Sequence, residues 1–161
     1  MRLYTFNNFY LSSLQQGLQS AHVTHELFIK YNHRTGDGID LWEWAENHKT
    51  MILLNGGMAS DLIVIEKVLA LPANPYPWAA FREEEAALNN SITSVGVVLP
   101  SKIYDGAAYL RTNNITDEQF SKDLWLPMPV DNGPDGIIEG VEYTPIEARL
   151  MSTINRCGLA R

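Results

Sequence analysis

The sequence has little cysteine, little clustered positive charge and no long apolar run. Its 161 residues include a single cysteine, Cys157, which excludes an intramolecular disulfide and is typical of a reducing compartment. No His or acid adjoins Cys157 in the segment NRCG, so we interpret it as structural. No window holds the roughly 20 apolar residues that cross a bilayer, and no basic segment followed by an apolar run opens the chain. We therefore expect a cytoplasmic protein without a membrane contact.

Positive charge is scarce, with 12 Lys and Arg against 19 Asp and Glu and a net charge of −7. The acidic excess is spread along the chain: six basic and ten acidic residues give −4 in residues 1–100, and six and nine give −3 in residues 101–161. No two basic residues are adjacent. Binding to a polyanion draws on clustered Lys and Arg, so an extended nucleic-acid interface is disfavoured. A small anionic ligand held by one or two arginines stays compatible with the sequence.

The distribution of apolar residues predicts an α/β fold. The hydrophobic content of 45% is sufficient for one compact core. Apolar runs predict strands, and capped amphipathic segments predict helices. The expected order over the first hundred residues is β-α-α-β-α-β-β, with strands at 2–9, 50–55, 78–81 and 92–99 and helices at 14–31, 41–49 and 60–71. This alternation predicts a three-layer sandwich around a small mixed, mainly parallel four-stranded sheet, with the two late strands pairing antiparallel.

The first predicted helix carries the densest set of chemically useful side chains. Ser13 and Gln16 match the S/T-x-x-E/Q capping box, which predicts that the helix begins at Leu14. Residues at three- and four-residue steps form one apolar face: Leu11, Leu14, Leu18, Ala21 and Phe28. A second set at the same steps is wholly polar: Gln15, Gln19, His22 and Glu26. The polar face either lines a pocket or is a solvated surface.

Two domains are expected, an α/β domain at residues 1–104 and a C-terminal extension at 105–161. Within the extension, Thr116 with Gln119 predicts a capped helix, and residues 124–136 are rich in Pro and Gly and predict irregular structure. Thr144, Pro145 and Glu147 predict the start of a final helix that runs to about residue 157. The extension is expected to pack on the first domain or to form an oligomer interface.

The segment LQQGLQSAHV at residues 14–23 resembles the G-K-x-A-A-Q-x-A-H-A signature of the type II peptidyl-tRNA hydrolases. Gln19, Ala21 and His22 fall on the Gln, Ala and His of that signature. A later family signature, an Asp-Ala-Gly-rich turn followed by a Thr-Val-type strand that ends in Gly-Pro, corresponds to residues 82–100. The resemblance covers about the first 100 residues. It implies the hydrolase fold and, by descent, cleavage of the ester bond in peptidyl-tRNA.

The departures from the family pattern change the expected function. The catalytic Lys of the family falls on Gln15, which carries no charge, and the acid of the family falls on Arg82. Glu83, Glu84 and Glu85 follow directly, so a small register shift supplies one of them as the acid, and Thr93 and Ser94 are the counterparts of the Thr of the family. Ester hydrolysis needs an activated water and stabilisation of the oxyanion, and the loss of an ammonium group weakens both.

Three functions follow from these residues. The first is sequestration of a small nucleotide-like ligand without turnover, with Trp42 or Trp44 stacking and Arg82 facing a phosphate; the other expected contacts are Gln15, Gln19, His22, Glu26, Thr93 and Ser94. The second is an esterase acting on the 3′ end of tRNA, with His22 and a glutamate from residues 83–85, Glu83 being the first of them, as base and Gln19 orienting the substrate. The third is a structural role, with the tryptophans at an interface between copies of a homo-oligomer. The chain also resembles small proteins encoded by bacteriophages, which implies the host cytoplasm and a counter-defence role for sequestration.

We expect neither a metal nor a cofactor. His22, His25 and Glu26 lie within one helical turn, but their spacing differs from the helical zinc motif and a third ligand is lacking. We expect His25 to pack at the edge of the core, whereas His33 and His48 lie in or beside predicted loops and are expected to be exposed. Residues 55–60, NGGMAS, follow a strand but match neither phosphate-binding spacing.

Overall fold

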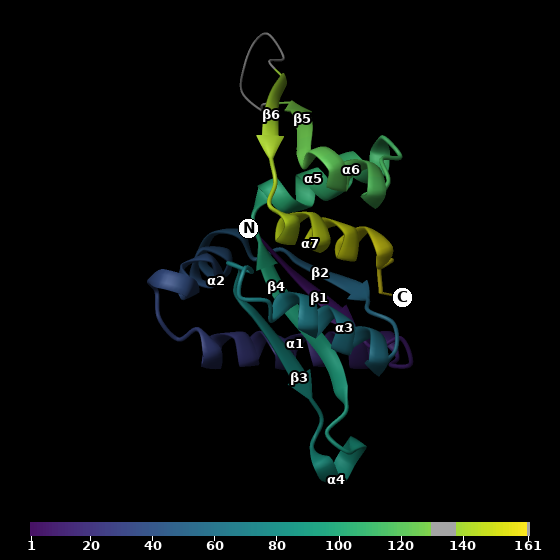
Figure 1. Ribbon diagram of the computed structural model, residues 1–161. Coiled ribbons are helices and arrows are strands. Elements are labelled where there is room, and N and C mark those ends of the chain that lie inside the picture. The colour runs from purple at the N-terminus through teal and green to yellow at the C-terminus, as the bar shows by residue number, and fades with distance from the viewer. Residues whose placement is uncertain (130–137, 161) are drawn as a thin grey trace. The chain divides into compact units, whose positions relative to one another are not determined.

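The computed structural model describes residues 1–129 and 138–160 (Figure 1). The chain divides into two compact units. Unit 1 comprises Met1–Pro100 together with Cys157–Arg161, and unit 2 comprises Ser101–Arg156. Among the helices of the described residues, none has the length and apolarity that crossing a membrane requires.

Unit 1 is built on a four-stranded mixed sheet in the order β2-β1-β4-β3. Its strands are β1 (Arg2–Asn7), β2 (Met51–Asn55), β3 (Trp78–Arg82) and β4 (Ile92–Leu99). Only β1 and β2 run parallel, because β4 lies antiparallel to both β1 and β3. The prediction of a mainly parallel sheet is therefore wrong, since β4 enters beside β1 in the opposite direction. The expected antiparallel pairing of the two late strands is confirmed.

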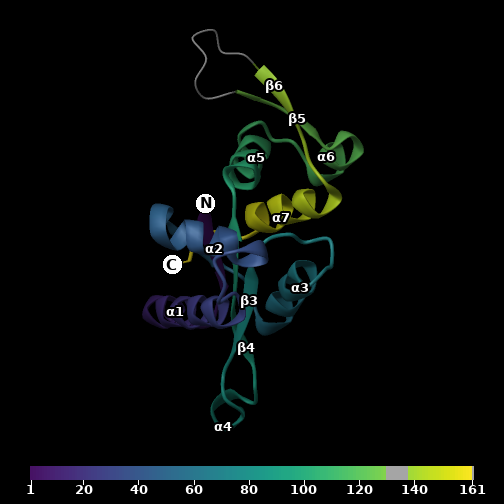
Figure 2. The same ribbon diagram turned by 90° about the vertical axis from the view of Figure 1, so that its left-hand side faces the viewer.

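Helices cover both faces of this sheet. Helix α1 (Ser13–Lys30) lies on one face and α3 (Ala59–Leu69) on the other (Figure 2). Under α1, buried apolar side chains from the helix and the strands form a core: Leu3, Val23, Leu27, Ala79 and Val98. Gly96 of β4 permits the close approach of α1, because a Cβ atom at this position would lie 3.2 Å from Cγ1 of Val23.

Short helical segments connect the longer elements of unit 1. Between α1 and β2 the chain forms η1 (Gly36–Gly38), α2 (Ile39–Glu43) and a π-helical turn, η2 (Trp44–His48). The spacing of Asp40 and Glu43 in the sequence predicts an N-cap at Asp40, which is wrong: the N-cap of α2 is Gly38, and Asp40 lies inside the first turn. A short helix, α4 (Glu85–Leu88), joins β3 to β4.

Helix α1 begins one residue earlier than predicted. Its capping box consists of Ser12 and Gln15, with the Gln15 amide N–H donating to Ser12 Oγ and the Gln15 side chain accepting from the Ser12 amide at 2.9 Å. The sequence SSLQQ satisfies the motif in two registers. The observed register turns Gln16 inward, where its Nε2 donates to the carbonyl of Leu11 at 2.9 Å. That buried contact is absent from the predicted register, in which Gln16 is part of the cap.

The face of α1 that contacts the sheet also differs from the prediction. Leu14 and Leu18 are 85% and 55% exposed, and His25 is exposed as well. The buried residues of the helix are instead Gln16, Gln19, Ser20, Val23 and Leu27. The periodicity of apolar residues predicted the wrong buried face, because the first half of α1 packs on the sheet through polar side chains. The expectation that His25 packs at the core edge is wrong for the same reason.

Unit 2 contains three helices and a hairpin among its described residues. They are α5 (Ser101–Thr112), α6 (Asp117–Asp123), β5 (Trp125–Pro129), β6 (Ile138–Glu142) and α7 (Pro145–Arg156). The predicted caps are confirmed: Thr116 pairs with Gln119, and Thr144 pairs with Glu147. Residues 125–129 form a strand where irregular structure was predicted, because β6 supplies the hydrogen bonds that make it regular. The remainder of that predicted segment, residues 130–136, lies outside the described residues.

Tyr143 makes the stability of the protein sensitive to alkaline pH. Burial, with smaller contributions from the carboxylates of Glu147 and Asp105, raises the pKa of Tyr143 from 10.0 to about 12. The unfolded chain therefore loses this proton first, and the free energy of unfolding falls as pH rises from 10 to 12. We expect wild type to lose roughly 2–3 kcal/mol relative to Tyr143→Phe over that interval. Urea unfolding of both proteins at pH 9 and pH 12 measures the difference, and parallel curves would contradict the assignment.

Candidate functional site

Polar side chains lie in a row across the sheet, at the carboxyl ends of β1 and β2. The strand register aligns Asn55 of β2 with Asn7 of β1, Asn7 with Ser94 of β4, and Ser94 with Phe81 of β3. Three of these four neighbours are polar, and the first half of α1 covers the row. Sheet positions under a helix are usually apolar, so this part of the interior is organised by hydrogen bonds.

Asn7 is the centre of the buried part of this row. Its side chain is fully buried, and its Oδ1 accepts hydrogen bonds from Ser20 Oγ at 3.2 Å and Ser94 Oγ at 2.9 Å. Its Nδ2 donates to the carbonyl and the hydroxyl of Thr5, at 3.4 and 3.3 Å. Ser20 also lies 2.8 Å from Thr5 Oγ1. This network fixes the position of α1 over the sheet.

Gln19 joins α1 to two segments that are distant in the sequence. Its Oε1 accepts from Thr93 Oγ1 at 3.1 Å, and its Nε2 donates to Glu83 Oε1 at 2.6 Å. A β-bulge makes this possible: the register shifts between Phe81 and Arg82, and the ladder passes from Ser94 to Ile92. Thr93 is therefore skipped by the pairing of β3 with β4, and its hydroxyl donates to Gln19 of α1. Gln19 is 6% exposed, and its hydrogen bond from Thr93 holds its amide in place. The amide in turn orients the half-buried carboxylate of Glu83.

His22 lies one turn along α1 from Gln19, on the same side of the helix. Its imidazole stacks on the ring of Phe81, with centroids 4.5 Å apart and planes 11° apart. Because Phe81 and Glu83 are alternate residues of the same chain segment, His22 and Glu83 border one surface between α1 and β3. We call Gln19, His22, Phe81, Glu83 and Thr93 the α1–β3 site.

The structure brings four of the predicted site residues together: Gln19, His22, Glu83 and Thr93. Ser94 belongs to the buried Asn7 network, and Glu26 lies half-buried one turn beyond His22 on α1. Arg82 points to the opposite face, where its guanidinium donates to Glu66 Oε2 of α3 at 2.6 Å. Gln15 is exposed and is held in the cap by Ser12.

The two tryptophans lie at the far end of α1. Trp42 donates from its indole to the carbonyl of Tyr31, which caps the C-terminus of the helix about 18 Å along its axis from Gln19. Trp44 is 6% exposed and donates to the carbonyl of Thr50 at 2.8 Å. Both rings thus serve packing within unit 1 and contribute nothing to the α1–β3 site.

The turn after β2 carries a carboxylate where a phosphate-binding turn would hold an anion. The amide of Met58 donates to Asp61 Oδ2 at 2.8 Å. Gly57 has φ +84°, and a Cβ atom there would lie 2.5 Å from the same oxygen. Negative charge already occupies the N-terminus of α3, which is unfavourable for a second anion. The described part of the chain also contains no group of three metal-ligating side chains.

Sequence reasoning missed Phe81 of the α1–β3 site, and it missed Asn7 and Ser20 of the buried network under α1. Asn7 falls near the end of the strand predicted at residues 2–9, and a buried Asn has no periodic signature. No protein-family model matches this sequence, and no curated protein matches it. The interpretation of the α1–β3 site therefore depends on its geometry.

Proposed function

We propose that this protein binds a small nucleotide-like ligand at the α1–β3 site and releases it unchanged. The observation that carries the proposal is the hydrogen-bonded chain from Thr93 through Gln19 to Glu83. It joins residues that are 64 and 74 positions apart, and it holds a carboxylate in a fixed orientation. Fixed polar groups beside an aromatic surface are the usual means by which a protein orients a small ligand.

The chemistry of the site favours ligand groups that donate hydrogen bonds. One oxygen of Glu83 is bound by Gln19, which leaves the other to accept from ribose hydroxyls or from the exocyclic amine of a base. Hydrogen bonds to a carboxylate are stronger than those between neutral groups. The stacked His22 and Phe81 rings add a flat surface next to this acceptor. A phosphate of the ligand would have to point away from the negative charge of Glu83. The guanidinium of Arg82 is paired with Glu66 and so does not offset that charge.

Binding without turnover is favoured by the position of Gln15. Its Oε1 accepts from both the amide and the hydroxyl of Ser12, at 2.9 Å each, so this side chain completes the helix cap. No ion pair of Glu83 with Lys or Arg occurs among the described residues. A site without a cation lacks the main means of stabilising the oxyanion of ester hydrolysis. Sequestration of a nucleotide signal, as in a phage counter-defence protein, fits these properties.

A divergent relationship to the type II peptidyl-tRNA hydrolases is part of this proposal. It is supported by a four-stranded mixed sheet packed by helices, and by the carboxylate of Glu83 beside Gln19. The same contact favours a second candidate, an esterase in which His22 and Glu83 activate water. The two candidates differ in the product: an intact ligand in one case, and a hydrolysed ester in the other.

Substituting Glu83 tests the proposed site. We expect Glu83→Gln to bind the preferred nucleoside or nucleoside monophosphate about 10- to 100-fold more weakly, because a charged acceptor becomes a neutral one. Titration calorimetry with a panel of adenosine, guanosine, cytidine and uridine and their 5′-monophosphates measures the loss. Glu84→Gln is the matched control, since Glu84 is exposed. Equal affinity of wild type and Glu83→Gln would reject the site, and cleavage of a peptidyl-tRNA mimic that His22→Ala abolishes would establish the esterase.

A further inference from the structure

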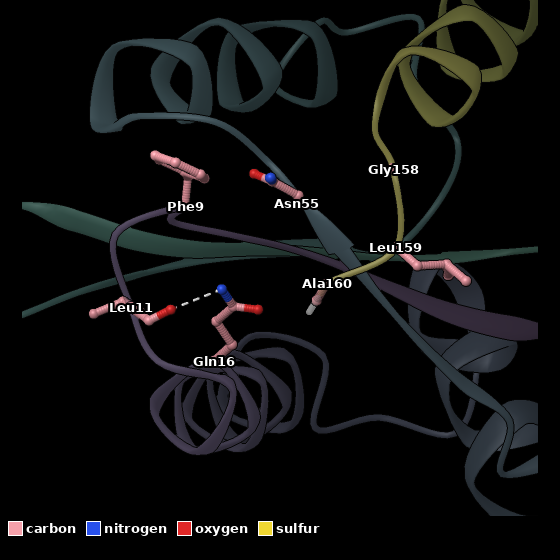
Figure 3. A pocket seen from close by; sticks show the side chains of 7 residues that line it. All are labelled: Phe9, Leu11, Gln16, Asn55, Gly158, Leu159 and Ala160. Atoms are coloured by element: carbon pink, nitrogen blue, oxygen red, sulfur yellow. Dashed lines mark hydrogen bonds between the residues drawn. The ribbon is translucent and has the colours of Figure 1, made fainter.

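A pocket of about 770 Å³ lies within unit 1, at the carboxyl ends of the parallel strands β1 and β2 (Figure 3). Its lining includes no residue of the α1–β3 site; it consists of Phe9, Leu11, Gln16, Asn55, Gly158, Leu159 and Ala160. The volume is in the range of pockets that hold small molecules. None of the seven lining residues carries a charged side chain.

Three chain segments build the walls of this pocket. The loops that follow β1 and β2 are joined by a hydrogen bond from the amide of Phe9 to the carbonyl of Gly57, at 2.8 Å. The C-terminal segment pairs with the free edge of β2: the Asn55 amide donates to Gly158 at 2.8 Å, and the Ala160 amide donates to Leu53 at 3.0 Å. The backbone of all three segments is thereby held in place, so the pocket is formed before any ligand enters.

Gln16 places an unpaired acceptor in the pocket. Its side chain is 4% exposed, and its Nε2 donates to the carbonyl of Leu11 at 2.9 Å. Its Oε1 finds no hydrogen-bond partner among the described residues, and in Figure 3 it points away from Leu11. The bond to Leu11 fixes which end of the amide is oxygen. A buried acceptor without a partner is unfavourable, so a donor group brought by a ligand would be strongly preferred here.

Asn55 and Phe9 complement this acceptor. Asn55 Oδ1 accepts from the amide of Gly57 at 3.0 Å, which leaves the two Nδ2 hydrogens to face a ligand. Phe9 is 54% exposed and supplies an aromatic face at the wall. The pocket therefore offers one acceptor, one donor and a ring. This set matches a flat molecule that carries a donor and an acceptor on its edge.

We propose that this pocket binds an uncharged planar heterocycle of the nucleobase class. The base edge donates to Gln16 Oε1 and accepts from Asn55 Nδ2, and the base face contacts Phe9. A phosphate is disfavoured because the lining contains no basic side chain, and a purely apolar ligand would leave Gln16 Oε1 without a donor. The inference is independent of the α1–β3 site, since the two share no residue.

The side-chain amide signals of the protein test the pocket directly. Full-length protein labelled with ¹⁵N is titrated with adenosine, guanosine, cytidine and uridine, and the Gln16 and Asn55 amide signals are followed by NMR. We expect at least one nucleoside to shift both signals in a saturable manner. Saturation that shifts Gln19 and His22 and leaves Gln16 and Asn55 unmoved would assign binding to the α1–β3 site and overturn the pocket. No saturable shift of Gln16 and Asn55 with any of the four nucleosides would overturn it too.

A variant separates recognition by Gln16 from a structural role. Gln16→Met is of similar length and removes both the unpaired acceptor and the hydrogen bond to Leu11, whose effects on stability oppose each other, so we expect the thermal midpoint to stay within about 3 °C of wild type. Nucleoside affinity should fall at least tenfold, while Leu18→Met, on the exposed side of α1, retains wild-type affinity. Unchanged affinity in folded Gln16→Met would overturn the proposal. If Gln16→Met fails to fold, the wild-type amide shifts decide the question.

Discussion

Replacing Asn7 with alanine is expected to lower the free energy of unfolding by about 3–5 kcal/mol. The substitution removes a fully buried side chain that accepts from Ser20 and Ser94 and donates to Thr5. Their hydroxyl groups are themselves buried, so water cannot replace the lost amide without opening the core. The cost combines a small cavity with the desolvation of unpaired polar groups.

Denaturant unfolding of Asn7→Ala against wild type measures this loss, with Asn32→Ala as the matched control because Asn32 is an exposed residue of the same type. A double-mutant cycle with Ser94→Ala identifies the network as the cause. In Asn7→Ala the Ser94 hydroxyl has already lost its acceptor. Ser94→Ala should therefore lower the free energy of unfolding by at least about 1 kcal/mol less in the Asn7→Ala background than in wild type. A strictly additive cycle would count against a coupled network.

Glu147 is expected to give the largest effect in unit 2, with Glu147→Ala losing about 3–4 kcal/mol of unfolding free energy. Glu147 is 6% exposed, and both of its oxygens lie 2.9 Å from Lys102 Nζ. The same carboxylate accepts from the amide of Thr144 at 2.8 Å and so caps α7. The substitution removes an ion pair between α5 and α7 and a helix cap at once.

Circular dichroism during urea unfolding is the appropriate measurement for Glu147→Ala. Glu142→Ala is the control, since Glu142 is exposed at the end of β6. Glu147→Gln keeps an acceptor for Thr144 but not the charge, so we expect it to lie between wild type and Glu147→Ala. Equal stability of Glu147→Ala and wild type would show that the ion pair and the cap are both dispensable.

Local signals in the sequence were sufficient to predict several elements. Strand β4 is confirmed over its full range, Ile92–Leu99, because a continuous apolar run closed by proline leaves few alternatives. The starts of α6 and α7 were also correct, since each has a single register that satisfies the capping pattern. The directions of the strands in the sheet were harder to predict. The antiparallel pairing of β4 with β1 depends on long-range contacts that no local pattern encodes.

The buried polar row explains why the face of α1 was mispredicted. Gln16, Gln19 and Ser20 are polar, yet all three are buried in the folded chain. Their side chains are hydrogen-bonded to Leu11, Glu83 and Asn7, respectively. A periodicity argument treats such residues as surface and assigns Leu14 and Leu18 to the core. Burial of polar groups depends on partners that are distant in the sequence, so it becomes visible only in the folded chain.

The candidate site was predicted in part for a similar reason. Gln19 and His22 share one side of a helix, which spacing alone reveals. Their partners Glu83 and Thr93 come from a β-bulge that shifts the register by one residue, so the sequence could propose Glu83 only as a shifted alternative to Arg82. Arg82 itself was expected in the site, but the alternation of side chains along β3 directs it to the face covered by α3.

The most direct test of the proposed function is recovery of the ligand. The purified protein is incubated with the nucleoside and nucleotide panel and with a peptidyl-tRNA, separated from free material, and denatured, and the released molecules are identified by mass spectrometry. The account predicts that an intact nucleotide-like molecule is recovered in stoichiometric amount from wild type and in reduced amount from Glu83→Gln. A cleaved tRNA ester, or no retained nucleotide from wild type, would contradict it.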